Sequence, residues 1–538
     1  MAKTVPVDKT FSRQLVAVGN DELWYESSAG TMGELAAANG DIDCTAPLQV
    51  FELLEKVFIV NGTNLKVADF GNTKIATASL GANPPDFNTV LTGGSGAKMV
   101  VDYITALTGA TTIYGKRTTA TTFTSGDTIT GTDDDGNAIS FTCTAAVEVA
   151  PPHWYDWTVY GNSSTYGVMP VQANEGCNWR GRACLTGDVD YPHQWYLSRQ
   201  KNPWDWNYVS DDAQSPVAGN DADAGEVGDI MVVMIPYKDD IMIDACANQL
   251  WYHAGDPADS GVIAELDLTT GILGARAWCW DNSENLYILG TTGILKIPAG
   301  FEQPANLTAV SWPNFIKDLA YNPATHRIVM AYDRQRDGLR ISRTTIADGT
   351  NTGWWYDFKT EGLFPESYPT QCGPYCMFHY ESTNPTYTGL LEGDHDGYIR
   401  EHLDAAVDDD IGATDEAIDS YYTVGPIRIG EETKEGMFTS LLGVPAGGKT
   451  AGTLTNSSAV SWKLWTAETS DELVEKLLAN TTPKITGTFA ALGTIRGARK
   501  RREVRGMYAG IRLGNDTAAE TWSLERLQMN YRKGGRLK

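Results

Sequence analysis

The sequence contains no long uncharged apolar segment. Among its 538 residues there is no apolar run of about 18, the length that a helix needs to cross a bilayer. We therefore expect no membrane span. The first residues, MAKTVPVDKTFSRQLVAVG, carry charges and have no continuous apolar region, which is not typical of a signal peptide. We expect the chain to fold in a cytoplasm, wherever it acts afterwards.

Cysteine and histidine are scarce, with eight and seven residues. The closest cysteines, Cys372 and Cys376, lack the second pair of soft ligands that a zinc site needs, so we expect free thiols. His395 and His402 do not have the spacing of a ligand pair. The sequence also has no GxSxG, Walker A or HExxH motif. It therefore predicts no catalytic residue, no metal site and no cofactor, and we expect a protein that is not an enzyme.

Two acidic segments, TDDDG at 132–136 and GDHDG at 393–397, could suggest calcium binding. A calcium loop of the EF type needs alternating oxygen ligands and a glutamate at its twelfth position, and neither segment has that spacing. Asp-Gly is also the favoured dipeptide of tight hairpin turns. We interpret both segments as turns.

Aromatic residues and glycines are abundant, with 16 Trp, 24 Tyr and 54 Gly, which favours short strands joined by tight turns. Hairpin patterns start at Val57, Ile241, Leu286, His326 and Thr388, and the last four starts are 45, 40 and 62 residues apart. A further candidate begins at Ala183. Spacings near 40 to 50 residues are typical of propeller blades. The sequence therefore predicts a mainly β protein with a β-propeller of about six blades.

The composition and the hydrophobic pattern of the sequence change along the chain and suggest five parts. Residues 88–150 are rich in Thr and Gly and predict a small β-domain inserted into a blade loop. The end of the chain alternates between strands and one helix, DELVEKLLAN with Ser470 as its N-cap, which predicts a β-sandwich-like module. The expected parts are an N-terminal segment (1–45), a first propeller blade (46–87), the inserted domain (88–150), the remaining propeller (151–405) and a C-terminal β-rich module with a basic end (406–538).

Charge is unevenly distributed. The last 48 residues, from Ala491 to Lys538, hold twelve Lys or Arg and four Asp or Glu, a net charge of +8. Since the whole chain carries −26, the rest carries −34. The candidate contact residues lie in RGARKRREVRG: Arg496, Arg499, Lys500, Arg501, Arg502 and Arg505. This segment is either a solvated loop or a contact for acidic partners, namely DNA phosphates or a neighbouring subunit. No base-reading element is visible, so a DNA contact would be independent of sequence.

Two stretches resemble a known family. The first is NWRGRACLTGDVDYPHQWYLSRQKNPWDWNYVS followed by IMIDACANQLWYHAGDP, and the second is the end of the chain, from RKRREVRGMYAG to GGRLK. They are similar to the tail nozzle, or packaged-DNA stabilisation, proteins of short-tailed bacteriophages. The resemblance spans most of residues 175–538, and the region before 175 departs from it. The matching residues of the first stretch are Arg180, Arg182, Ser198, Pro203, Asp205, Trp206, Trp251 and Gly255.

The resemblance implies a structural virion protein. Such a protein forms a homo-hexameric ring in the phage tail below the portal and adaptor, beside tail fibre or needle proteins. The ring extends the channel in which the genome is retained and through which it is ejected, so double-stranded DNA passes independently of sequence. An excess of acid suits such a channel, because phosphates find no cations to bind in an acidic lumen.

A different class of function stays open. The aromatic stretches PPHWYDWTVY (151–160) and NPWDWNY (202–208) are either propeller core or a platform that stacks on sugars. The alternative is therefore a propeller-type glycan-binding or glycan-degrading tail enzyme. A bacterial outer-surface propeller is a third option, which the absence of a recognisable signal peptide disfavours.

Overall fold

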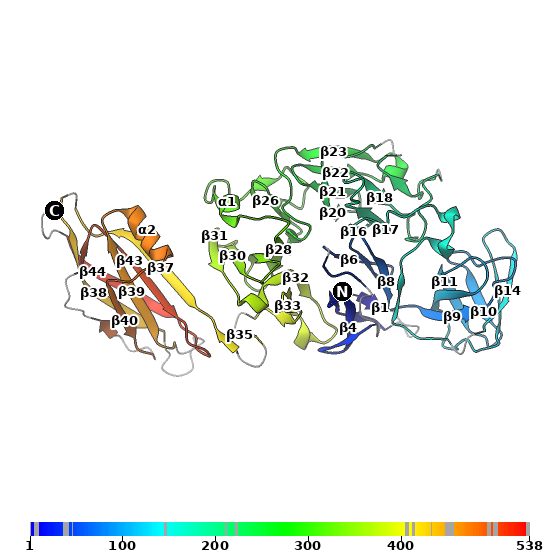
Figure 1. Cartoon of the computed structure of the whole chain (residues 1–538), viewed down its shortest axis with the longest axis horizontal. Coiled ribbons are helices and arrows are strands. Elements are labelled where there is room, and N and C mark those ends of the chain that lie inside the picture. Colours follow the sequence, from blue (N-terminus) through cyan, green and yellow to red (C-terminus); the bar gives the residue numbers. More distant parts are fainter. Residues whose placement is uncertain are drawn as a thin grey trace. The chain divides into compact units, whose positions relative to one another are not determined.

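The computed structural model forms two compact units, residues 1–402 and 403–538 (Figure 1). It describes the chain apart from residues 1, 5–9, 36–41, 46, 145–147, 210–211, 221–223, 404–407, 412–414, 432, 447–456, 492–495, 499–503 and 534–538. Among the described residues, no helix combines the length and apolar character needed to cross a membrane.

The first unit consists of small antiparallel sheets that follow one another along the chain. Four of them take four consecutive strands: β16–β19 (Glu175–Trp179, Arg182–Thr186, Trp195–Leu197, Val217–Ala218), β20–β23 (Met231–Lys238, Ile241–Cys246, Leu250–Ala254, Val262–Asp267), β24–β27 (Trp278–Trp280, Leu286–Gly290, Gly293–Ile297, Ala305–Asn306) and β28–β31 (His326–Asp333, Gly338–Thr345, Asn351–Asp357, Gly362–Glu366). Two sheets have three strands: β3–β5 (Val16–Gly19, Glu22–Ser28, Thr31–Glu34) and β32–β34 (Pro374–Tyr380, Gly389–Asp394, Ile399–Glu401). β1 (Ala2–Thr4) pairs with β2 (Ser12–Gln14).

Tight turns set the register of these hairpins. Between β16 and β17, Arg180 and Gly181 both have positive φ angles, 54° and 73°, and Trp179 pairs directly with Arg182. A two-residue loop of this kind matches the right-handed twist of the two strands. Short helical turns connect other strands: η1 (Tyr160–Asn162), η2 (Ser164–Tyr166), η3 (Pro257–Asp259), α1 (Phe315–Leu319), η4 (Thr370–Cys372) and η5 (Pro385–Tyr387).

The sheets surround a common centre with their first strands innermost. β16 contacts β6 (Gln49–Leu53) on one side and β20 on the other, and β28 contacts β24 and β32. Figure 1 shows β16, β20, β28 and β32 nearest the centre and β23 and β31 at the outside. The predicted fold class, a mainly β protein with a β-propeller, is confirmed. The predicted count of about six blades stays a prediction, because it depends on whether the two three-stranded sheets make one blade or two.

The N-terminal segment closes the ring. Leu23 of β4 packs against Val57 and Ile59 of β7 (Lys56–Val60). On the other side, Leu15 packs against Tyr380 of β32, whose hydroxyl donates a hydrogen bond to the carboxylate of Glu26. The segment expected only as an N-terminal extension therefore supplies strands that lie between the first blade and the last.

The inserted domain interrupts the first blade between its third and fourth strands. That blade has the order β15-β8-β7-β6, with β8 at Leu65–Asp69 and β15 at His153–Asp156. The insertion is a six-stranded sheet of order β14-β13-β10-β11-β12-β9: β9 (Thr73–Thr77), β10 (Val90–Gly93), β11 (Lys98–Ile104), β12 (Thr111–Arg117), β13 (Thr128–Thr132) and β14 (Ala138–Thr142). The expected start at residue 88 is too late, because β9 pairs with β12 of the insertion and not with the blade.

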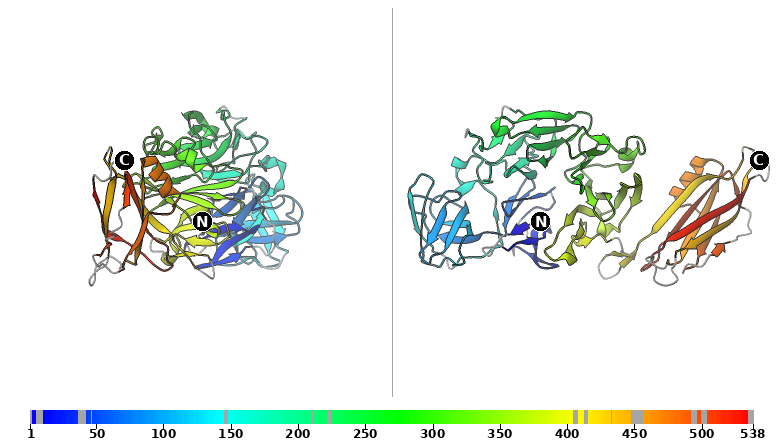
Figure 2. Two further views of the ribbon diagram at one scale, coloured as in Figure 1. Left: turned by 60° about the vertical axis from the view of Figure 1, so that its left-hand side comes forward. Right: turned by 180° about the vertical axis from the view of Figure 1, so that it is seen from behind.

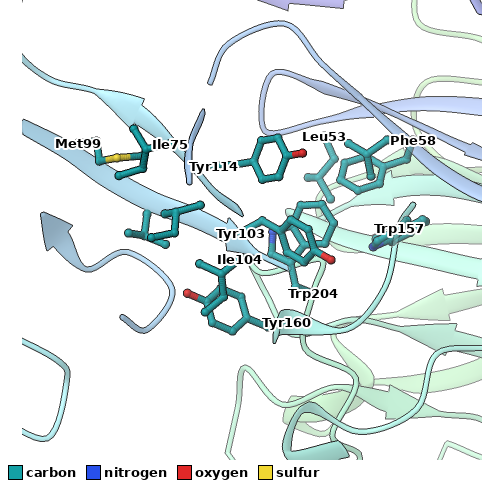
Figure 3. Packing of buried hydrophobic residues seen from close by; sticks show 14 of the residues in the cluster. Leu53, Phe58, Ile75, Met99, Tyr103, Ile104, Tyr114, Trp157, Tyr160 and Trp204 are labelled. Atoms are coloured by element: carbon teal, nitrogen blue, oxygen red, sulfur yellow. The ribbon is translucent and has the colours of Figure 1, made fainter. Parts of the chain in front are cut away.

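The insertion shares a hydrophobic core with the propeller. Tyr103 of β11 stacks on Trp204, with ring centroids 4.5 Å apart (Figure 3). It also stacks on Tyr155 of β15, with ring centroids 5.3 Å apart. Lys56 of β7, which is 3% exposed, forms an ion pair with Asp102 of β11. Figure 2 shows the inserted sheet beside the first blade from behind. The insertion is therefore packed onto the propeller over a broad interface.

The second unit is a β-sandwich. One sheet has the order β37-β43-β39-β40: β37 (Ser420–Arg428), β43 (Tyr508–Asn515), β39 (Val460–Ala467) and β40 (Ile485–Phe489). The other joins β38 (Gly436–Pro445) to β41 (Arg496–Ala498), β42 (Val504–Gly506) and β44 (Leu524–Arg532). The two sheets enclose a core around Phe438, Trp462 and Ile511. Helix α2 (Ser470–Leu478) covers the first sheet. The N-cap of α2 is Thr469, one residue before the predicted Ser470. Ahead of the sandwich, β35 (Asp408–Asp410) pairs with β36 (Asp415–Ala417).

Residues of the family resemblance build the β16–β19 blade. The Arg182 guanidinium is fully buried, forms an ion pair with Asp256, and donates hydrogen bonds to four backbone carbonyls, including that of Ser198. The Pro203 carbonyl accepts hydrogen bonds from two indole groups, one of which belongs to the fully buried Trp206. The part of the sequence that carries the resemblance therefore maintains the fold.

The Arg182 network leads to the first prediction. Arg182→Met should lower the free energy of unfolding by about 3 to 5 kcal/mol, because it leaves Asp256 and the carbonyls without their buried donor. Arg199→Met is the matched control: its ion pair with Asp212 is partly exposed, and its loss should cost at most about 1 kcal/mol. Denaturant titration followed by tryptophan fluorescence measures both. Equal losses in the two variants would contradict the importance of the buried network.

Candidate functional site

The structure describes only the ends of the predicted basic segment. Arg496 lies in β41, where its backbone pairs with Gly443 of β38, and Arg505 lies half-buried in β42 opposite Met437. Both strands are antiparallel to β38, so the segment between them joins two strands of one sheet. The other four candidates lie outside the described residues: Arg499, Lys500, Arg501 and Arg502. Their contact with DNA or a neighbouring subunit stays a prediction.

The two units differ strongly in charge. Residues 1–402 hold 24 Lys or Arg and 50 Asp or Glu, so the propeller unit carries the whole net charge of −26. Residues 403–538 hold 18 of each and are neutral as a whole. Inside this second unit, residues 403–435 hold two basic and ten acidic residues, and residues 436–538 hold sixteen and eight. Since residues 491–538 alone hold a net charge of +8, the whole basic excess of this stretch belongs to the end of the chain, and residues 436–490 are neutral.

One arginine joins three sheets at the centre of the propeller. Arg276, just before β24, donates one hydrogen bond to the Tyr375 carbonyl on β32 (3.0 Å) and another to the Leu48 carbonyl ahead of β6 (2.6 Å). A single side chain thus bridges the propeller axis at this end.

A buried glutamate lies near this arginine. Glu175, at the start of β16, is 6% exposed, and its Oε2 has no hydrogen-bond partner among the described residues. Burial raises the pKa of Glu175 to about 8, although the positive charge of Arg276 opposes this shift. The carboxyl group therefore keeps its proton at neutral pH and can donate a hydrogen bond.

A second arginine completes the group. Arg327, near the start of β28, is half-buried, and burial together with the positive charge of Arg276 lowers its pKa. Its side chain forms no hydrogen bond or ion pair within the described part of the chain. Tyr321 and Tyr375 are close enough to act on its charge. We call Glu175, Arg276, Arg327, Tyr321 and Tyr375 the central cluster.

A cavity of about 300 Å³ lies at the opposite ends of the inner strands. Its lining includes Tyr237 and Lys238 at the end of β20, Trp280 at the end of β24, and Glu284. The rings of Tyr237 and Trp280 are 5.1 Å apart at an angle of 48°. Tyr237 is buried in the core, so Trp280 is the partly exposed aromatic ring of this cavity. An aromatic face beside charged groups is suited to a polar ligand with apolar faces, such as a sugar. The volume is at the lower end of the range for ligand pockets, about 300 to 1,000 Å³.

Neither the central cluster nor the cavity was predicted from the sequence. Of the two interpretations of the aromatic stretches, the structure supports the propeller core for Trp157, Tyr160, Trp204 and Trp206, which are all buried. The members of the cavity and of the central cluster come from different blades, so no local motif marks them. All eight cysteines are free thiols, and five are buried. In the described part of the chain, no group of three or more His, Cys, Asp or Glu is placed to hold a metal ion.

No protein-family model and no curated protein matches the chain. Among solved structures, tricorn protease is 10% identical with a TM-score of 0.25; the match covers 72% of this chain and 37% of that one. A quinoprotein alcohol dehydrogenase-like protein of Bacteroides thetaiotaomicron is 10% identical with a TM-score of 0.28, covering 66% and 76%. The extracellular domain of a putative hybrid two-component system of the same organism is 11% identical with a TM-score of 0.25, covering 97% and 79%. At such TM-scores these likenesses indicate nothing about function.

The buried carboxyl group leads to a prediction on pH. Between pH 4.5 and pH 8, folded Glu175 keeps a proton that the unfolded chain loses, so this group lowers stability as the pH rises through that window. Glu175→Gln removes the effect. The variant should gain up to about 4 kcal/mol over the wild type at pH 8 and almost nothing at pH 4.5.

Denaturant titrations at several pH values test this, with Glu284→Gln in an exposed turn as the matched control. The control should follow the wild type throughout. A Glu175→Gln variant whose stability differs from the wild type by a constant amount at every pH would contradict the assignment.

Proposed function

We propose that the chain is a structural subunit of a bacteriophage tail, which forms a ring below the portal and adaptor and retains and releases double-stranded DNA. The observation that carries the proposal is a separation of charge along the chain. The propeller unit, residues 1–402, is strongly acidic. The second unit, residues 403–538, is neutral as a whole and holds a basic excess within residues 436–538. Such a chain presents opposite charges to a neighbouring copy, and electrostatic complementarity guides assembly.

The closed propeller axis supports a ring of copies. Because Arg276 bridges that axis, a conduit for DNA has to be enclosed by several chains. A ring multiplies the acidic excess of the propeller unit by the number of its subunits. Where those acids line the lumen, DNA phosphates find little counter-charge and the duplex stays mobile. The resemblance of residues 175–538 to tail nozzle proteins points to the same role.

The basic segment provides the test of assembly. Reversing Arg499, Lys500, Arg501 and Arg502 to Glu should abolish ring formation or weaken it by more than tenfold, on the order expected for losing several charge pairs. Native mass spectrometry and light scattering over a range of protein and salt concentrations measure the oligomer.

The matched control reverses four exposed lysines of the propeller unit, Lys98, Lys201, Lys317 and Lys359, and should leave the ring intact. A chain that stays monomeric at all concentrations and does not co-purify with tail proteins would refute the proposed function. Its position in a virion reconstruction would decide the matter directly.

The cavity beside Trp280 favours a second candidate, a propeller that binds glycans. If this is the function, Trp280→Ala should raise the Kd for a surface polysaccharide about tenfold, because about 1.5 kcal/mol of ring stacking is lost. Trp312→Ala, which removes a partly exposed indole outside the cavity, is the control. Calorimetry across a panel of host glycans measures binding, and the absence of binding across that panel would eliminate this candidate.

A further inference from the structure

The two sheets of the sandwich differ in width by one strand. The first sheet has four strands, whereas the second has only three positions, because β41 and β42 lie in line on the same side of β38. β41 contacts β40 and β42 contacts β39, so β44 lies on the side of β37. The indole of Trp522, just ahead of β44, donates a hydrogen bond of 2.7 Å to the hydroxyl of Ser420 on β37. A fourth strand of the second sheet would therefore lie beside β44 and opposite β37.

Side chains that point into the sandwich are exposed on this side. Tyr422 of β37 pairs directly with Leu513 of β43, and directly opposite side chains lie on the same face of a sheet. Leu513 is buried in the core, whereas Tyr422 is 58% exposed. On β44, Met529 is only half-buried although it lies opposite the fully buried Leu441, and Tyr531 on the same face is 36% exposed. We call Tyr422, Met529, Tyr531 and the free edge of β44 the open side of the sandwich.

The free edge of β44 determines which kind of partner fits. β44 has nine residues and pairs only with β38 among the described residues. The backbone groups along its other edge can pair with a further strand, whose alternate side chains would cover the open side. Arg526, Arg532 and Lys533 are exposed along this edge, and Glu525 is the one acid among residues 524–533. The partner that fits is therefore an extended strand with an excess of acid.

Such a strand lies at the outside of the propeller. β23 is the outermost strand of its blade and pairs only with β22 among the described residues (Figure 1). Val262 at its start is 53% exposed, Leu268 just past its end is 45% exposed, and Glu265 between them is exposed. Residues 255–275 hold four acids and no lysine or arginine. β23 thus combines a free edge with exposed apolar side chains and negative charge.

The other outer strands of the propeller fit less well. β19 and β27 have two residues each, and the three-stranded sheets end in β5 and β34, with four and three residues. β31 contains Pro365, which has no N–H group to donate. β15 packs against the insertion, since its Tyr155 stacks on Tyr103. With six residues, β23 is the longest outer strand of the blades that the structure describes.

We propose that β23 of one copy adds to the free edge of β44 in a second copy, where it takes the position of the missing strand and covers the open side. Because the two surfaces differ, the contact is head-to-tail, which closes into a ring or continues as a filament. The inference rests on the proposed function, a ring of copies, and names the surfaces through which the copies meet. Opposite charges guide the encounter, and backbone hydrogen bonds and apolar contacts hold the two strands together.

Two variants and their mixture test the contact. Tyr422→Asp places a charge on the open side, and Glu265→Lys reverses the exposed charge of β23. Each should raise the Kd between copies by about tenfold or more. In an equimolar mixture, the first variant still has an intact β23 and the second still has an intact open side. The mixture should therefore form a one-to-one heterodimer that does not grow further, which native mass spectrometry detects.

The matched controls are Leu478→Asp, which changes an exposed apolar residue of the same unit, and Glu302→Lys, which reverses an exposed acid of the propeller. Both should assemble like the wild type. Tyr422 and Glu265 are exposed, so their variants should melt at the temperature of the wild type. Single variants that assemble like the wild type, or a mixture without the heterodimer, would overturn the contact.

Hydrogen exchange at low and high protein concentration locates the contact without any variant. Amides of β23 and β44 should exchange more slowly at high concentration, whereas those of β31 should not change. Such protection in a chain that forms only dimers or filaments supports the contact and contradicts the ring. A ring without protection at β23 and β44 overturns the contact and leaves the proposed function standing. Protection that is the same at every concentration overturns the assignment to a second copy.

Discussion

The propeller depends on the contact between its N-terminal segment and its last sheet. Each small sheet buries its faces only against the sheets beside it, so an open ring would leave two faces exposed to water. Leu23 and Leu15 fill the two sides of the gap, and the hydroxyl of Tyr380 reaches Glu26 across more than 350 residues of chain. This closure fixes the positions of the inner strands, and the central cluster is formed at their starts.

The fold was more predictable from the sequence than the sites were. Hairpins are local, so alternating residues and turns at regular spacing indicated the propeller, the insertion and the sandwich. The start of the insertion was misplaced because TKIAT (73–77) alternates like a blade strand, and only its pairing with β12 shows that it belongs elsewhere. The N-cap of α2 was missed by one residue because Thr469 and Ser470 are both suitable caps.

The central cluster could not be predicted, because its residues come from different sheets and are brought together only by ring closure. Glu175 begins one blade, Arg276 precedes another, and Arg327 lies in a third. In the sequence each is a single charged residue beside a strand, which is ordinary for an exposed position. The residues that did stand out, such as Arg182 and Trp206, serve the core of one blade. In this chain the residues that form conspicuous local patterns stabilise the fold, whereas the candidate binding residues are dispersed along the sequence.

Ring closure also sets the surroundings of Arg276. This residue lies just before β24, and its guanidinium donates hydrogen bonds to the Tyr375 carbonyl on β32 and to the Leu48 carbonyl ahead of β6. The two acceptors belong to the last sheet and to the first blade, which are held beside each other only when the N-terminal segment closes the ring. An opened ring would separate these acceptors and leave a half-buried guanidinium without its partners. Closure of the ring and the position of Arg276 therefore depend on each other.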